Sequence, residues 1–135
     1  MMSPKIRILI VDDHEQVRNG LCKLLSREED MEIVAESTNG KEALADAATY
    51  LPDIILMDAK MPMSDGLQAT NAISEKGVSC KIIMLTMFEE YLDEAMKNGA
   101  RGYLLKGIDI HYLSDTIRSV HEGNIVIDER IGTAV

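Results

Sequence analysis

Apolar residues occur along this chain in short continuous runs that alternate with longer segments of helical periodicity. Strands that are buried on both faces of a parallel sheet have such continuous apolar runs. The runs with this character are Ile6–Val11, Ile54–Met57, Lys81–Thr86 and Gly102–Lys106. A further segment, Met31–Ser37, alternates apolar and polar residues with period two, which predicts an edge strand with one wetter face. The pattern therefore predicts five strands.

Each predicted strand is followed by a segment in which apolar residues recur at positions that share one face of a helix. These segments are Glu15–Arg27, Lys41–Tyr50, Leu67–Lys76, Glu89–Asn98 and Ile110–Glu122. Strands that alternate with helices form a parallel sheet with helices on both faces and right-handed crossovers. For a five-stranded, doubly wound, flavodoxin-like domain the common strand order is 2-1-3-4-5, with a switch point between the first and third strands.

Three carboxylates follow the two strands that flank this switch point. Asp12 and Asp13 come directly after the first strand, and Asp58 comes directly after the third. Open α/β sheets bind ligands outside the carboxyl ends of the strands at the switch point. Taken alone, Asp58 is equally consistent with an ordinary strand end, but the two acidic signals converge on one crevice.

Three carboxylates in a partly dry cleft repel one another by roughly 4 kcal/mol per close pair at an effective dielectric constant near 20. A bound cation relieves this repulsion, and an all-oxygen set of carboxylates, backbone carbonyl and waters suits Mg²⁺. His14 adjoins the acidic pair, but His111 and His121 are ten residues apart and lack the spacing of zinc ligands. All three histidines are therefore predicted to be surface or helix residues.

Two further strands end in residues that suit phosphate chemistry, Thr86 and Lys106. A hydroxyl donor, an ammonium group and a hard cation around one carboxylate are the components that phosphoryl transfer requires. Asp58 would then be the nucleophile and would form an aspartyl-phosphate. Each of the two residues alone fits an ordinary strand end, but their occurrence at one sheet edge favours the phosphoryl-transfer interpretation.

Composition and charge narrow the class of protein. The 135 residues, 46% of them hydrophobic, suffice for one domain with a core, and no apolar run is long enough to span a membrane. Only Cys22 and Cys80 are present and no signal peptide is apparent, which predicts a reducing compartment, the cytoplasm. A net charge of −9 argues against this chain binding a nucleic-acid backbone by itself.

Four short motifs occur in order along the chain: V-D-D ending at Asp13, L-M-D-A-K-M-P around Asp58, M-L-T ending at Thr86, and G-Y-L-L-K ending at Lys106. With them the sequence resembles the receiver domain of two-component response regulators, and is most similar to the NarL/FixJ (LuxR-type) subfamily. The resemblance covers residues 6–123.

The resemblance implies a role for each matching residue in phosphoryl transfer. Asp58 would be the phosphoacceptor, taking its phosphoryl group from a phosphohistidine on a sensor histidine kinase or from a small phosphodonor. Thr86 would donate its hydroxyl to one phosphoryl oxygen, and Lys106 would form an ion pair with another. Tyr103 matches the aromatic switch residue that turns inward when Thr86 moves. The domain would catalyse its own phosphorylation and slow dephosphorylation without being an enzyme for other substrates.

The resemblance also implies a Mg²⁺ site. Asp13, Asp58 and the backbone carbonyl of Lys60 would bind the cation directly, and Asp12 would hold a metal-bound water.

By the same resemblance, residues 1–123 are expected to form the receiver domain and residues 124–135 to begin a linker to a helix-turn-helix DNA-binding domain that this chain lacks. The expected function is to control transcription through that output domain, with phosphorylation-dependent homodimerisation. Contact with DNA would occur only through the output domain, and no contact with a membrane is expected.

Two other classes of function remain open from the residues. A phosphohydrolase of the haloacid dehalogenase type also uses an aspartyl nucleophile, but places it after the first strand in a D-x-D motif that Val11-Asp12-Asp13-His14 lacks. A pseudo-receiver would act as an interaction module without phosphate. The joint presence of Asp58, Thr86 and Lys106 argues against it.

Overall fold

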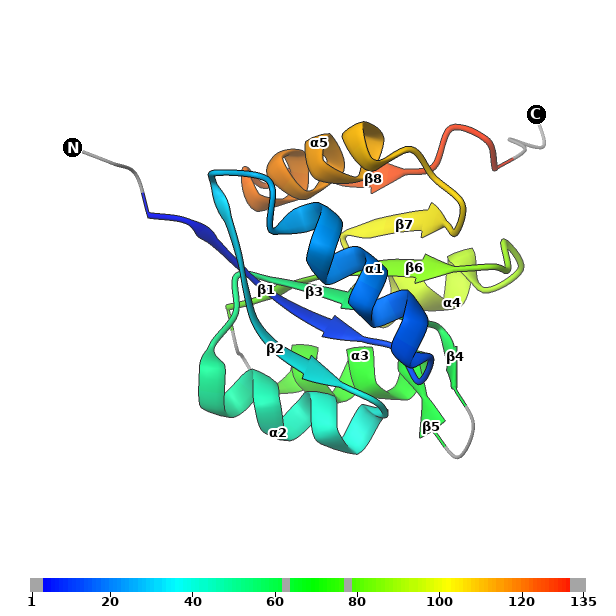
Figure 1. Ribbon diagram of the computed structural model, residues 1–135. Coiled ribbons are helices and arrows are strands. Elements are labelled where there is room, and N and C mark those ends of the chain that lie inside the picture. The colour runs from blue at the N-terminus through cyan, green and yellow to red at the C-terminus, as the bar shows by residue number, and fades with distance from the viewer. Residues whose placement is uncertain (1–3, 62–63, 77–78, 132–135) are drawn as a thin grey trace.

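In the computed structural model, which describes residues 4–61, 64–76 and 79–131, the apolar runs form a parallel sheet at the centre of the molecule (Figure 1). The strand order in this sheet is β2-β1-β3-β6-β7-β8. The strands are β1 (Ile6–Val11), β2 (Met31–Ser37), β3 (Ile54–Met57), β6 (Lys81–Thr86), β7 (Gly102–Leu105) and β8 (Val126–Ile127). The first five strands in this order confirm the predicted 2-1-3-4-5 arrangement.

The sheet has a sixth strand that the sequence pattern did not predict. In β8, Val126 pairs with Gly102 and Ile127 pairs with Tyr103, parallel to β7. A strand of two residues is too short to show an alternation of apolar and polar positions, so its sequence cannot be distinguished from that of a loop. Residues 126–131 therefore lie along the outer edge of β7, although the position of any linker that follows stays a prediction.

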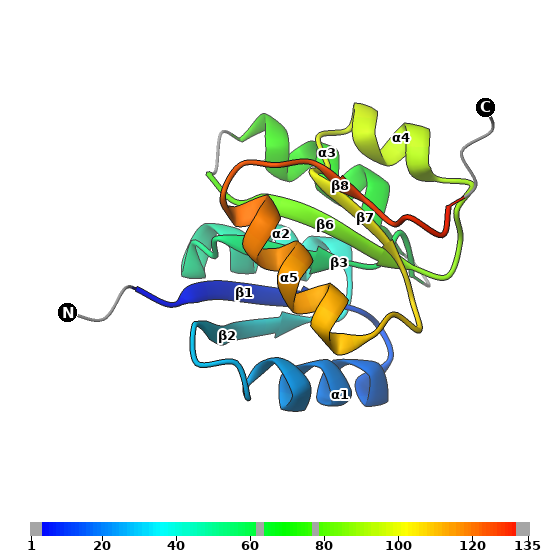
Figure 2. The same cartoon turned by 90° about the horizontal axis from the view of Figure 1, so that it is seen from above.

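The helices cover both faces of the sheet, as Figure 2 shows from above. Their bounds are α1 (Glu15–Leu25), α2 (Gly40–Tyr50), α3 (Gly66–Glu75), α4 (Leu92–Lys97) and α5 (Ile110–His121). Apolar side chains of α2, α3 and α4 pack with one face of the sheet, and those of α1 and α5 pack with the other. This two-sided burial explains why the central strands have continuous apolar runs rather than alternation.

Helix α4 begins later than predicted, at Leu92 rather than near Glu89. In a continuous helix the N–H of Leu92 would bond the carbonyl of Phe88, but it bonds the carbonyl of Glu89 at 3.3 Å instead. The Phe88 carbonyl accepts a hydrogen bond from the Tyr103 hydroxyl on β7. A tertiary contact therefore delays the start of the helix.

The loop after β3 contains a small antiparallel pair, β4 (Lys60–Met61) and β5 (Ser64–Asp65). Asp65 then caps α3, because its Oδ1 accepts a hydrogen bond from the N–H of Leu67 at 2.8 Å. This pair returns the chain to a position beside Asp58, and Gly66, the first residue of α3, donates its N–H to the carbonyl of Ala59 at 3.0 Å.

Candidate functional site

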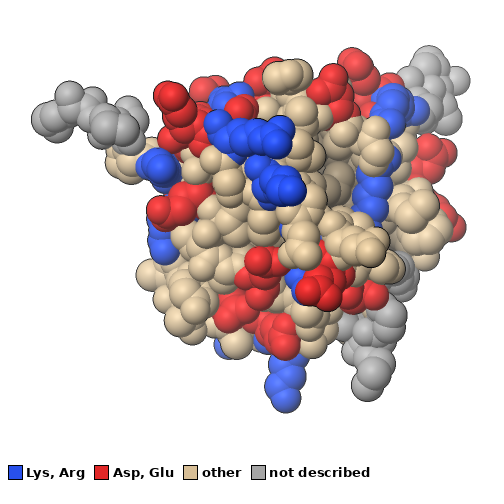
Figure 3. Space-filling view, viewed as in Figure 1, with Lys and Arg blue, Asp and Glu red and all other residues tan. Residues whose placement is uncertain are grey.

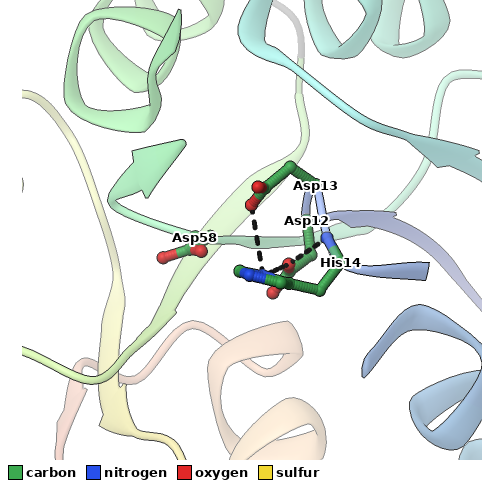
Figure 4. Close-up of side chains that lie close together, drawn as sticks. All are labelled: Asp12, Asp13, His14 and Asp58. Atoms are coloured by element: carbon green, nitrogen blue, oxygen red, sulfur yellow. Dashed lines mark hydrogen bonds and ion pairs between the residues drawn. The ribbon is translucent and has the colours of Figure 1, made fainter. Parts of the chain in front are cut away.

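Five of the predicted site residues lie at the carboxyl ends of neighbouring strands, whereas Tyr103 lies within β7 and Lys60 begins β4. Asp12 and Asp13 follow β1, Asp58 follows β3, Thr86 ends β6 and Lys106 follows β7. Figure 4 shows Asp58 close to Asp12, Asp13 and His14, where the paired strands β1 and β3 end. The fold therefore brings to one edge of the sheet residues that lie up to 94 positions apart, from Asp12 to Lys106.

Lys106 joins two of the carboxylates. Its Nζ lies 2.8 Å from Oδ2 of Asp12 and 3.2 Å from Oδ2 of Asp58. Burial alone would lower the pKa of Lys106, but the hydrogen bond to Asp12 and the charge of Asp58 raise it above its ordinary value. Burial alone would likewise raise the pKa of Asp12, yet hydrogen bonds from Lys106 and the His14 backbone lower it. The pair is therefore held in its ionised form.

Asp13 supplies a buried carboxylate oxygen to the site. Its Oδ1 is buried and accepts no hydrogen bond within the described part of the chain. Ligand atoms of Asp12, Asp13, His14 and Asp58 lie within 4.8 Å of one another. A buried acceptor without a donor costs free energy, and a cation would satisfy it. Since the carboxylate oxygens are hard ligands, this acidic cluster could hold a hard divalent cation.

His14 belongs to the same cluster, although the sequence alone placed it only on the surface. Its side chain is 64% exposed, as predicted, but Nδ1 lies 3.0 Å from Oδ1 of Asp12 and 3.3 Å from Oδ1 of Asp13. The position of His14 directly after the acidic pair was the available signal. Lys60 begins β4, two residues after Asp58, and its carbonyl as a metal ligand stays a prediction.

Thr86 and Tyr103 both contact the backbone of Phe88. The buried Thr86 accepts a hydrogen bond at Oγ1 from the N–H of Phe88, at 3.4 Å, and the Tyr103 hydroxyl donates to the Phe88 carbonyl. Tyr103 is fully buried, and this burial raises the pKa of its hydroxyl to about 12. The aromatic side chain thus lies inward, and the loop that carries Phe88 is held by both residues of the predicted switch.

Comparison with known proteins identifies the family of this chain. The family model of the response regulator receiver domain matches residues 8–118. The chain belongs to the response regulator receiver family. The matched range runs from within β1 through most of α5 and includes all three site aspartates, Thr86 and Lys106.

Relatives of known name place this receiver domain in the NarL/FixJ (LuxR-type) subfamily. It is 41% identical over 133 residues to the oxygen regulatory protein NreC of Staphylococcus aureus, covering 96% of this chain and 61% of NreC. The chain thus spans about three fifths of the length of that relative. It is a receiver domain of a LuxR-family two-component response regulator and, as such, a signalling protein.

Solved structures agree with this assignment. The structure of a two-component response regulator of the LuxR family from Aurantimonas sp. SI85-9A1 matches with a TM-score of 0.89 and 31% identity, covering 94% of this chain and 92% of that one. A DNA-binding response regulator of the LuxR family from Staphylococcus aureus matches with a TM-score of 0.81 and 30% identity, covering 86% and 98%. In the described part of this receiver domain, no helix has the length and apolar character needed to cross a membrane.

Sequence reasoning missed two features near the site. Gly66 lies against the backbone of Asp58, and the only local signal for this was the turn sequence Asp65-Gly66. Asp128 is a buried carboxylate that bonds β7 next to Lys106, and nothing in its local sequence distinguishes it from a surface residue.

Proposed function

We propose that this receiver domain is a phosphorylation switch that transfers a phosphoryl group from the phosphohistidine of a sensor histidine kinase to Asp58. The observation that carries this proposal is the position of Lys106, whose ammonium group bridges Asp12 and Asp58. An ammonium group held beside a carboxylate nucleophile is placed to neutralise the charge of an incoming phosphoryl group.

In the proposed reaction an oxygen of Asp58 attacks phosphorus, a P–O bond forms, and the P–N bond to the kinase imidazole breaks. The imidazole nitrogen keeps the electron pair and takes a proton from solvent. Lys106 would exchange its contact with Asp58 for an ion pair with a phosphoryl oxygen, and the Thr86 hydroxyl would donate to another. Attack of water on the aspartyl-phosphate would return the carboxylate and release phosphate.

Mg²⁺ is the cation that we propose for the acidic cluster. Asp13, Asp58 and the carbonyl of Lys60 would hold it directly, and Asp12 would hold it through a water. When bound, it supplies positive charge beside the phosphoryl oxygens. Oδ1 of Asp13 supports this assignment, since it is buried, accepts no hydrogen bond among the described residues, and has only an ion-pair contact with His14 at 3.3 Å.

Mg²⁺ is expected to raise the melting temperature of the wild-type domain and to leave that of Asp13→Asn nearly unchanged. A ligand that binds only the folded state stabilises it by about 2.7 kcal/mol at a hundredfold excess over its dissociation constant. Thermal unfolding monitored by circular dichroism over a Mg²⁺ titration measures this. Asp93→Asn, on the exposed surface of α4, removes the same charge as a control. An equal shift in Asp13→Asn would place the cation elsewhere.

The phosphoacceptor is tested by intact mass after incubation with acetyl phosphate and Mg²⁺. One added phosphoryl group is expected in the wild type, and none in Asp58→Asn or in the presence of a chelator. The neutral amide of asparagine cannot act as the nucleophile. No adduct in the wild type, under conditions that preserve acyl phosphates, would contradict the proposal and favour a pseudo-receiver.

We further propose that phosphorylation promotes homodimerisation and controls transcription through a separate helix-turn-helix output domain. Basic side chains on the face shown in Figure 3 form small separate groups among acidic and uncharged ones, and the net charge is −9. This distribution supports contact with DNA through another domain rather than through the receiver domain. Sedimentation of the phosphorylated sample, beside Asp58→Asn, tests dimerisation, and an unchanged monomer would contradict it.

We propose the cytoplasm as the compartment of this switch. Cys22 and Cys80 are both free thiols, and the reducing cytoplasm keeps thiols in that state. Cell fractionation with an antibody against the chain tests this placement.

A further inference from the structure

Asp128 is a buried carboxylate outside the residues that the family model matches. It is 2% exposed, and it lies ten residues beyond position 118. A buried carboxylate is costly unless hydrogen bonds and an opposite charge compensate it. The groups that bond Asp128 must supply this compensation, so they indicate its role in the fold.

Those partners lie at the end of β7. The ladder between β8 and β7 ends where Ile127 pairs with Tyr103, and the next N–H, of Asp128, bonds the carbonyl of Tyr103 at 2.7 Å. Leu105 is the next residue of β7 whose polar groups point toward this edge, since alternate residues of a strand bond the same side. Beyond the backbone N–H of Asp128, side chains rather than backbone groups bond this edge of β7.

Two side chains hold both polar groups of Leu105. Oδ2 of Asp128 accepts the N–H of Leu105 at 2.9 Å, and Nη2 of Arg130 donates to the Leu105 carbonyl at 2.9 Å. Arg130 also donates to Oδ2 of Asp128 at 2.8 Å, and the pKa of Asp128 is lowered to about 2 by this pairing. We call Asp128 and Arg130, with the two bonds that they make to Leu105, the Leu105 clamp.

The clamp lies one residue from the site. The N–H of Lys106, directly after Leu105, bonds the carbonyl of Thr86 at 2.8 Å, while the Lys106 ammonium reaches Asp12 and Asp58. The end of β7 is thus held by Thr86 on one side and by the clamp on the other. Ile131 also ties residues 126–131 to β7, because its side chain is buried in the same core cluster as that of Tyr103.

We propose that Asp128 is a positioning residue for Lys106, and that the Leu105 clamp couples phosphorylation of Asp58 to residues 126–131. This rests on the proposed function. A phosphoryl group gives Lys106 a new anionic partner, and any movement of its backbone reaches Leu105 through one peptide bond. Because a carboxylate buried without its partners is costly, the clamp favours two discrete states, closed or released. Coupling is reciprocal, so releasing the clamp also alters the site.

Phosphorylation kinetics with acetyl phosphate test the positioning role. In Asp128→Asn the maximal rate constant is expected to fall about two- to thirtyfold, the range for residues that carry coupling between sites, with the half-saturating acetyl phosphate concentration unchanged. Asp115→Asn is the matched control, since that carboxylate is 78% exposed on α5. Arg130→Gln keeps the buried carboxylate, removes its charged partner, and should lower the rate in the same direction even where Asp128→Asn folds poorly.

Amide hydrogen exchange, followed by NMR, separates coupling from a purely structural role. Protection of the Leu105 and Asp128 amides is expected to differ between the phosphorylated and unphosphorylated wild type, and to be the same in treated and untreated Asp58→Asn. Wild-type kinetics in folded Asp128→Asn and Arg130→Gln would overturn the positioning role. Unchanged protection in a wild-type sample shown by mass to be phosphorylated would overturn the coupling and leave the proposed function standing. A wild type that takes no phosphoryl group would instead overturn both.

Discussion

Lys106→Met is expected to lower the rate of Asp58 phosphorylation by about a hundred- to a thousandfold, the loss typical of removing one group that stabilises the transition-state charge. Methionine retains most of the length and apolar stem of lysine but has no ammonium group. The bridge at 2.8 Å to Asp12 and 3.2 Å to Asp58 would be lost, and with it the cation placed for the phosphoryl oxygens. Quenched time courses with acetyl phosphate and saturating Mg²⁺, read by intact mass, measure the rate.

Lys97→Met is the matched control, because Lys97 is exposed at the end of α4 and its replacement changes the net charge equally. This variant is expected to be phosphorylated at the wild-type rate. A Lys106→Met protein that is folded and phosphorylated at a comparable rate would show that the bridge is only structural. The assignment of transition-state stabilisation to Lys106 would then be wrong.

Gly66→Ala is expected to destabilise the domain by at least the upper end of the roughly 1–3 kcal/mol that overpacking costs. A Cβ at position 66 would lie 1.9 Å from the carbonyl oxygen of Asp58 and 2.9 Å from its carbonyl carbon. These are backbone atoms beside a central strand, so a side-chain rotation cannot relieve the clash. Urea unfolding gives the change in free energy, and phosphorylation should slow as well because the backbone of Asp58 must move.

The same substitution at Gly20 is expected to have the opposite sign. Gly20 lies inside α1, and a Cβ there meets no atom within 4 Å among those described. Alanine loses less backbone entropy than glycine in a helix, which gives a gain of roughly 0.5–1 kcal/mol. Equal effects of the two substitutions on the urea midpoint would contradict the close approach of Gly66 to Asp58.

The predicted loss in Lys106→Met and the expected Mg²⁺ dependence have one origin. Two nearly buried carboxylates, Asp12 and Asp58, face one another, and the ammonium of Lys106 offsets their repulsion on one side. On the other side, Oδ1 of Asp13 accepts no hydrogen bond among the described residues and contacts His14 at 3.3 Å, and a cation there would compensate its charge. This concentration of charge costs stability and provides the reactivity that the proposed function needs, as is common at functional sites.

The sequence by itself determined most of the fold and which strand ends carry the polar side chains of the candidate site. Buried parallel strands need continuous apolar runs and amphipathic helices need a 3.6-residue period, and both patterns are local, so the strand bounds of β1, β2, β3 and β6 were predicted as observed. Carboxylates, a hydroxyl and a lysine at strand ends predicted which residues would meet, because parallel strands place their carboxyl ends at one edge.

Only the tertiary structure decided how these residues contact one another. The bridge from Lys106 to Asp58 spans 48 positions, and the bond from Leu105 to Asp128 spans 23. The sixth strand, the burial of Asp128, the approach of Gly66 to Asp58 and the late start of α4 also depend on distant partners. A local sequence pattern indicates whether a residue will be buried or exposed. A hydrogen bond between distant segments forms only after packing has brought those segments together, so no local pattern predicts it.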